Sequence, residues 1–287
     1  RMALINLDWD SPLIEAEEEL RIQLSRDVLE AARTLSPKEV RYLVDLYYNM
    51  QDGRIATAHR IRKALESPEQ PHRILAWTLN HTQKLERAIA RFMDEFSDMH
   101  RPARWAKSLY GIGPVLASGL LAHIDIEKTP SVTSLWRFSG FDPTQKWAKG
   151  EKRPYNALLH RLGYLIARSF ILFSSRPQCF YGPFYLRWKA EAARRNELGG
   201  FKELAAEQLR KKSFRKDTTA KAAYERGELP DAHLAAYARR KVAKLFLSHY
   251  WEVAYECHYG KPPPFKPWII DVGGHKSYVP PPNWPVD

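Results

Sequence analysis

Apolar residues recur at helical spacing along most of this 287-residue chain, and that spacing restricts its fold more than any other feature. One stripe advances in alternating steps of four and three residues: Leu85, Ile89, Phe92, Phe96 and Met99. A second apolar stripe runs through 232–260 and stops at Gly260. Runs that alternate apolar and polar residues, as half-buried strands do, are few. We therefore expect an all-α fold.

Residues 1–100 are expected to form a helical scaffold. The sequence SPKE at 36–39 is typical of a helix start, with a capping serine, a proline at the first helical position and a glutamate that bonds back. SPEQ at 67–70 offers a second such start. The stripe that ends at Met99 packs either inside one chain or as a short coiled coil between two copies. A homodimer or higher oligomer is therefore one expected partner.

The remainder of the chain divides by composition. Residues 101–260 are expected to form one domain, in which 190–230 is so rich in charge that it predicts exposed helices or a mobile insertion. Residues 261–287 hold 8 of the 20 prolines, which excludes a regular helix there. Trp268 and Trp284 can anchor this tail to the body of the protein or to a partner.

Basic residues outnumber acidic ones by 45 to 33, and the excess is unevenly distributed. Residues 1–35 have a net charge of −4, whereas residues 101–190 carry 14 basic and 4 acidic side chains, a net charge of +10. Positive charge concentrated in this way favours a nucleic acid as the partner.

Several classes of protein are disfavoured by composition. Cys179 and Cys257 are too few for a disulfide framework and form no CxxC pair, so we expect a reducing, cytoplasmic compartment. No apolar run is long enough to cross a membrane, and no secretory signal opens the sequence. Histidine, cysteine and acidic residues show no metal-binding spacing, so we expect no metal ion and no other cofactor.

The sequence GIGPV at 111–115 predicts a turn between two helices that is open to a ligand. Gly111 can end the first helix in a left-handed conformation, and Pro114 can begin the second. Gly113 has no side chain to cover the unpaired N–H groups of the first helical turn, so a phosphate oxygen can approach them. An ordinary connection between helices could have the same residues. The residues expected to contact a nucleic-acid backbone here are Gly111, Ile112, Gly113 and Val115, with Lys107 as a nearby cation.

A second candidate surface is the loop TQKWAKGEKRPY at 144–155, where cations alternate with aromatic residues. Aromatic faces can stack on exposed bases while the cations neutralise phosphates, which suits single-stranded or distorted nucleic acid. A solvated loop with its tryptophan in the core is the alternative. The residues expected at this surface are Lys146, Trp147, Lys149, Lys152 and Arg153. Cations expected to extend it are Arg161, Lys211, Lys212, Arg215 and Lys216.

The segment 108–143, SLYGIGPVLASGLLAHIDIEKTPSVTSLWRFSGFDP, resembles the helix-hairpin-helix core of insertion-sequence-110-type transposases. In the C-terminal half of those proteins, a GIGP turn precedes a helix of small residues and leucine, a short linker and a glycine–proline end. AYARRKVAKLFLSHYWEV at 236–253 resembles the terminal helix of the same domain. The resemblance covers about 100–175 and 230–257, and it implies DNA as the partner, with a structured RNA as guide.

The chain departs from that family where the family's chemistry takes place. Recombination there uses a RuvC-like nuclease domain with four acidic residues, and a serine nucleophile just after the glycine–proline element. The stretch 140–154 contains no serine. The positions that align with the family's serine are occupied by about Trp147 and Ala148. The first hundred residues predict helices, with Asp8 and Asp10 as the one suggestive acidic pair.

We therefore expect a DNA-binding relative without catalytic activity, encoded by a phage or another mobile element. Two alternatives stay open. One is an active recombinase or nuclease whose site is completed by a partner or by residues that the sequence does not reveal. The other is a module that binds structured RNA or serves assembly.

Overall fold

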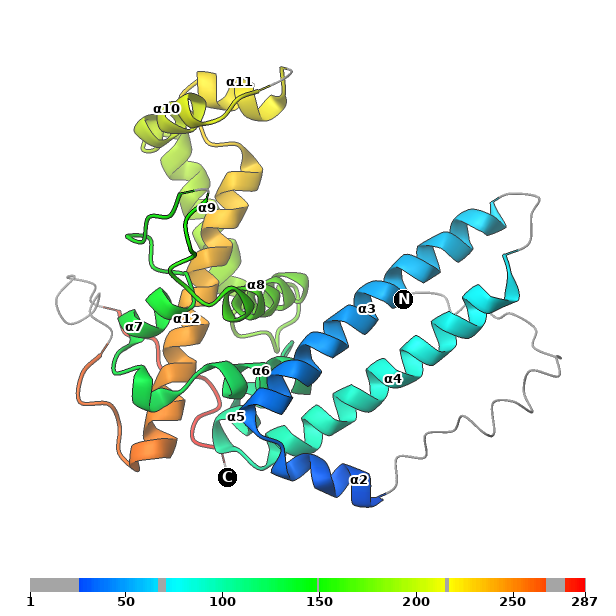
Figure 1. Ribbon diagram of the computed structural model, residues 1–287. Helices are drawn as coiled ribbons and strands as arrows, with labels where there is room; N and C mark the ends of the chain where they lie inside the picture. Colours follow the sequence, from blue (N-terminus) through cyan, green and yellow to red (C-terminus); the bar gives the residue numbers. More distant parts are fainter. Residues whose placement is uncertain (1–25, 67–70, 149, 215–216, 267–276, 287) are drawn as a thin grey trace.

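The computed structural model describes residues 26–66, 71–148, 150–214, 217–266 and 277–286, and every regular element in them is a helix. The expected all-α fold is therefore confirmed (Figure 1). None of the helices in these segments is long and apolar enough to span a lipid bilayer. Some predictions fall outside the described residues: Asp8, Asp10, the helix start at 67–70, Lys149, Arg215, Lys216 and Trp268.

Two long helices lie side by side near the start of the described chain (Figure 1). They are α3 (Pro37–Leu65) and α4 (Arg73–Asp98), and they follow the short elements α2 (Arg26–Ala31) and η1 (Ala32–Thr34). The helix start at 36–39 is confirmed, because the Ser36 amide donates to Glu39 Oε2 at 2.7 Å and the Glu39 amide donates to Ser36 Oγ at 3.4 Å. Each of these two side chains thus accepts a hydrogen bond from a backbone amide that has no acceptor within the helix.

The predicted apolar stripe packs inside the chain from Leu85 to Phe96, whereas Met99 at its end is 56% exposed. Ile89 and Phe96 are buried in a cluster with Val44 of α3. Val115 and Leu162, from two helices further along the chain, belong to the same cluster. The boundary expected near residue 100 is therefore not a boundary in the packing, because helices on both sides of it share this cluster.

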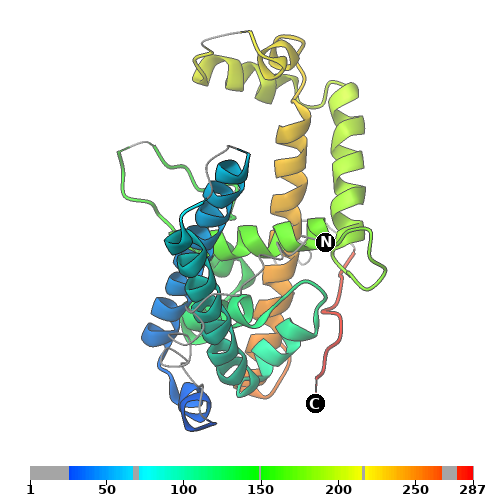
Figure 2. The same ribbon diagram turned by 90° about the vertical axis from the view of Figure 1, so that its right-hand side faces the viewer.

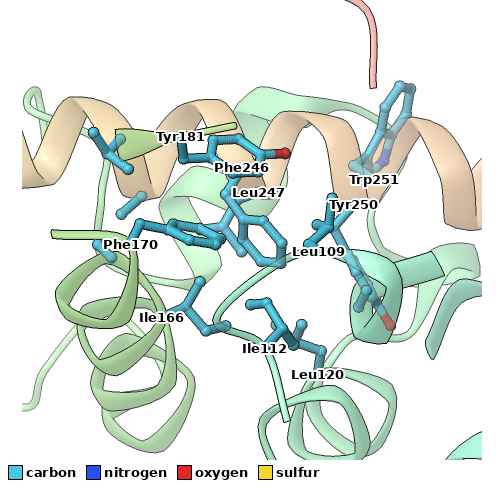
Figure 3. Packing of buried hydrophobic residues seen from close by; sticks show 14 of the residues in the cluster. Leu109, Ile112, Leu120, Ile166, Phe170, Tyr181, Phe246, Leu247, Tyr250 and Trp251 are labelled. Atoms are coloured by element: carbon cyan, nitrogen blue, oxygen red, sulfur yellow. The ribbon is translucent and has the colours of Figure 1, made fainter. Parts of the chain in front are cut away.

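Shorter elements surround one long helix near the C-terminus. The shorter ones are α5 (Arg101–Ser108), α6 (Pro114–His123), η2 (Ile126–Lys128), α7 (Val132–Phe138) and α8 (Ala157–Leu172). The long helix is α12 (Asp231–Tyr259), and it ends at Gly260, whose φ of +67° is left-handed. Figure 3 shows the main buried cluster, in which the ring of Phe246 on α12 lies 5.7 Å from that of Phe170 on α8.

The charged segment 190–230 is largely helical. It contains the end of α9 (Gly182–Glu197), all of α10 (Lys202–Lys211) and all of α11 (Thr219–Glu225). Phe201 and Tyr224 are buried in a small cluster that these helices cover. In Figures 1 and 2, α9 and α12 form a projecting arm with α10 and α11 at its end, and α3 and α4 form a second arm. Of the two expectations for this segment, exposed helices are the one observed.

Residues 277–286 pack onto the body of the protein. The Trp284 indole N–H donates to Glu256 Oε2 at 2.8 Å. The indole N–H of Trp105, a residue of the main buried cluster, donates to the Pro282 carbonyl at 2.7 Å. Trp284 therefore anchors this part of the tail to the body, which is one of the two arrangements expected from the sequence.

Candidate nucleic-acid interface

The turn between α5 and α6 is fixed by a buried side chain. Ile112 lies in the main cluster, and Figure 3 shows it beside Leu120. The Ile112 amide donates to the Leu109 carbonyl at 3.0 Å, so it is already paired within the turn. The expected ligand contact at Ile112 is therefore corrected, because this residue anchors the turn and offers a ligand neither side chain nor amide.

Gly111 is required by backbone conformation and by close packing. Its φ of +103° is left-handed, and a Cβ built on it would lie 2.9 Å from Ser169 Oγ and 3.3 Å from Phe173 Cδ2. The Ser169 hydroxyl also donates to the Gly111 carbonyl at 2.6 Å. The predicted left-handed turn is thus observed, and α8 holds it in place.

Gly113 leaves the start of α6 open. It occupies the capping position without a side-chain hydrogen bond, and α6 begins at Pro114 as predicted. A Cβ built on Gly113 would meet no atom within 4 Å. The first backbone bond closing the helix runs from the Ala117 amide to the Gly113 carbonyl at 3.1 Å, so the amides of Val115 and Leu116 have no backbone acceptor among the described residues. Those amides keep the capacity to donate to an anion.

A pocket of about 390 Å³ lies at this helix start, between α3, α4, α6 and α8. Gly113 and Val115 line it, and Arg168 of α8 lines it too. The Arg168 side chain is exposed and has no hydrogen-bond or ion-pair partner within the described part of the chain. Other residues with polar groups in the lining are Tyr47, Tyr48 and Gln51 of α3 and Ser169 of α8. The pocket therefore combines unpaired helix amides with one uncompensated guanidinium, which together suit an oxyanion.

Lys107 does not take part in this pocket. Its ammonium lies 2.6 Å from Asp94 Oδ1 and 2.5 Å from Asp98 Oδ1, and its side chain is only 16% exposed. Both carboxylates belong to α4, so the salt bridges join α5 to the N-terminal arm. The expected role of Lys107 is corrected accordingly, because two acidic partners already neutralise its charge.

The basic loop is held by its own contacts and projects from the body. The Trp147 indole N–H donates to the Glu151 carbonyl at 2.8 Å, and the Arg153 guanidinium carbon lies 5.4 Å from the centre of the Trp147 ring. Trp147 is 43% exposed, so it is not a core residue. Lys146 and Lys152 are exposed as well. This arrangement keeps an aromatic face and three cations accessible to solvent.

The turn and the basic loop lie at opposite ends of α8. Asn156, which follows the loop, caps the start of α8, whereas Ser169 near the helix end contacts the turn. The 16 residues of α8 span about 24 Å at 1.5 Å per residue. In Figure 2 the loop projects from one end of α8, and the chain leaves from the other end toward α9. The structure therefore presents two separate basic sites.

The remaining predicted cations have partners of their own. Arg161 lies 3.6 Å from Asp52 and 4.8 Å from the centre of the Tyr48 ring, and it is still partly exposed. Lys211 pairs with Glu207. Lys212 donates to the Tyr224 hydroxyl at 3.1 Å. These residues lie beyond the pocket at Gly113, since none of them lines it.

The sequence did not reveal the contribution of Arg168. This residue follows Gly113 by 55 positions, and the helix that carries it predicts only core packing. The one local signal is that Arg168 interrupts the apolar run LGYLIARSFILF. Arg168 reaches the pocket only because α8 lies across the turn, and no sequence pattern around residue 168 predicts that packing.

Two further observations bear on function. Within the described residues, no group of three histidine, cysteine or acidic side chains could hold a metal ion. Comparisons of the chain with protein-family models, curated proteins and solved structures find no match.

Proposed function

We propose that this protein binds nucleic acid, with duplex DNA as the partner, and that the start of α6 holds one backbone phosphate. The open capping position at Gly113 carries the proposal, since no side chain caps the helix there and the amides of Val115 and Leu116 lack a backbone acceptor among the described residues. The positive end of the helix and the Arg168 guanidinium would both stabilise an anion there. A contact of this kind orients a strand without reading its sequence.

The basic loop would supply a second point of attachment. Because the two sites lie toward opposite ends of α8, a strand that reaches both would have to run along this helix. Lys146, Lys152 and Arg153 would neutralise phosphates at the far site. Trp147 would stack on a base where the duplex is distorted.

We further propose that this protein is a relative of insertion-sequence-110-type transposases that lacks their recombination chemistry. The GIGP turn between α5 and α6 supports the relation, and the absence of serine from 140–154 argues against the chemistry. Duplex DNA incubated with the protein and magnesium or manganese should stay intact. Strand cleavage or joining would instead favour the alternative of an active recombinase or nuclease.

Competition binding tests the choice of partner. Fluorescence anisotropy with a labelled duplex, competed by unlabelled duplex, single-stranded DNA and structured RNA, should give the tightest competition by duplex. Affinity should fall steeply with salt, because each phosphate neutralised releases a condensed counterion. Tighter competition by structured RNA would assign the same surface to RNA.

Two matched variants separate a specific contact from overall charge. Arg168→Gln and Lys107→Gln each remove one positive charge, but only Arg168 lines the pocket, since Lys107 is bound to Asp94 and Asp98. Arg168→Gln should weaken duplex binding about tenfold, which corresponds to the loss of one charge-assisted hydrogen bond. Lys107→Gln should change it little. Equal losses from the two variants would mean that only the net charge matters.

A further inference from the structure

A second pocket, of about 410 Å³, lies between α7, α9, α12 and the C-terminal segment, and no residue of the turn or the basic loop lines it. One wall is fixed by hydrogen bonds between α12 and that segment. His249 Nε2 donates to the Val279 carbonyl at 2.8 Å, and the Tyr278 hydroxyl donates to Glu252. A pocket of this size is large enough for a small organic ligand.

Two lysines of α12 face two tryptophans in this pocket. Lys244 Nζ lies 3.9 Å from the centre of the Trp136 ring, and Lys241 Nζ lies 4.8 Å from the centre of the Trp188 ring. Neither ammonium has a hydrogen-bond or ion-pair partner anywhere in the described segments. Burial lowers the pKa of Lys244, an effect that Asp142 opposes and Lys241 reinforces, and burial likewise lowers the pKa of Lys241.

Arg187 and two carboxylates, Glu191 and Glu252, also line the pocket. Glu191 lies 3.7 Å from Arg187 Nε, and burial raises the pKa of Glu252, which accepts the bond from Tyr278. The three cations of the lining, Arg187, Lys241 and Lys244, therefore outnumber its two carboxylates by one, and Glu191 partly offsets the charge of Lys241. An anion placed there would offset the cost of desolvating the two lysines.

We propose that this pocket binds a nucleotide, with Lys241 and Lys244 holding the phosphate and the base lying against the partly exposed indole of Trp188. Two ammonium groups three residues apart on one helix face match a doubly charged phosphate. The exposed part of the Trp188 indole matches a flat aromatic ring. This proposal concerns different residues from the proposed duplex site and does not depend on it.

Isothermal titration calorimetry on the full chain tests the proposal. The probes are adenosine 5′-monophosphate and cytidine 5′-monophosphate, with adenosine and inorganic phosphate titrated separately. At least one monophosphate should bind, and both partial ligands should bind about tenfold more weakly or worse, because each makes only half of the contacts.

Three variants locate the binding. Lys244→Met and Lys241→Met keep most of the aliphatic stem and remove the charge, so each should weaken monophosphate binding about tenfold. Lys189→Met is the matched control, because Lys189 pairs with Asp231 across the same two helices but does not line the pocket. The control should bind like the wild type. Having two lysine variants keeps the test informative if one of them folds poorly.

Several results would overturn the nucleotide site. They are an absence of heat with either monophosphate, unchanged affinity in both folded lysine variants, or inorganic phosphate binding as tightly as the monophosphates. Gly113→Asp, which alters the start of α6, should leave monophosphate binding unchanged. Failure of the nucleotide site and failure of the duplex site are therefore separate outcomes.

The nucleotide could be free or part of a single strand, and the neighbouring surface of α9 allows the two to be distinguished. Arg187 and Glu191 also line an adjacent hollow together with Arg194 and Arg195. If the ligand is a strand, a short oligodeoxyadenylate should displace the monophosphate, and Arg194→Gln should weaken the oligonucleotide alone. If the ligand is a free nucleotide, the oligonucleotide should not compete.

Discussion

Replacing the two glycines of the turn by alanine should affect stability very differently. At Gly111 alanine would have to adopt a φ of +103°, and a left-handed conformation costs an L-residue about 1–3 kcal/mol. Its Cβ would lie 2.9 Å from Ser169 Oγ. Displacing that hydroxyl from the Gly111 carbonyl would cost about 1 kcal/mol more. We therefore expect Gly111→Ala to lower the free energy of unfolding by about 2–4 kcal/mol.

At Gly113 the backbone has a φ of −100° and a ψ of 174°, which any residue adopts, and an added Cβ would meet nothing within 4 Å. Gly113→Ala should change the free energy of unfolding by less than about 1 kcal/mol, because lower entropy of the unfolded chain offsets the loss of a better capping residue. Urea unfolding followed by circular dichroism would measure both variants, provided their m-values agree. Equal destabilisation, or a Gly111→Ala midpoint matching that of the wild type, would refute this account of the two glycines.

Three further predictions concern the rest of the fold. Burial lowers the pKa of His123 and of His249 to about 4, so the unfolded chain takes up protons first as the pH falls. The free energy of unfolding should then drop by about 2 kcal/mol per histidine from about pH 6.5 to pH 5, and unfolding curves that do not move over this range would contradict the burial of both rings. Phe246→Ala should cost about 3–5 kcal/mol in thermal or urea unfolding, and a loss below about 1 kcal/mol would mean that the main core is not packed around this ring. A chain ending at residue 276 leaves the Trp105 indole N–H without its acceptor at Pro282, so it should unfold about 1–3 kcal/mol more easily, and unchanged stability would show that the tail does not contribute.

Features encoded within a few residues could be predicted from the sequence. The Ser36–Glu39 capping box, the start of α6 at Pro114 and the end of α12 at Gly260 all appear where local patterns placed them. The all-α class followed from helical spacing in the same way. Each of these depends on backbone groups and side chains that are neighbours along the chain.

Features that depend on contacts between different helices were not predicted. Lys107 could be read as a free cation near the turn until α4 brought Asp94 and Asp98 beside it. Arg168 reaches the start of α6 only because α8 crosses the turn. The pocket lined by Lys241, Lys244, Trp136 and Trp188 lies between α7, α9 and α12, so the sequence of no single segment predicts it. Charge in the sequence therefore predicted a basic protein, but it could not say which cations lack an acidic partner.

Binding of duplex DNA by Gly113→Asp tests the central claim most directly. An aspartate there would cap α6 with its own carboxylate, which stabilises a helix start by up to about 1 kcal/mol, and would place negative charge where the phosphate is proposed to bind. Gly113→Asn is the matched control, since it caps the helix without the charge. At about 0.15 M salt, the account predicts that the aspartate variant is at least as stable as the wild type yet binds the duplex about tenfold or more weakly than the asparagine variant. Equal affinity of the two folded variants would show that no phosphate binds at the start of α6.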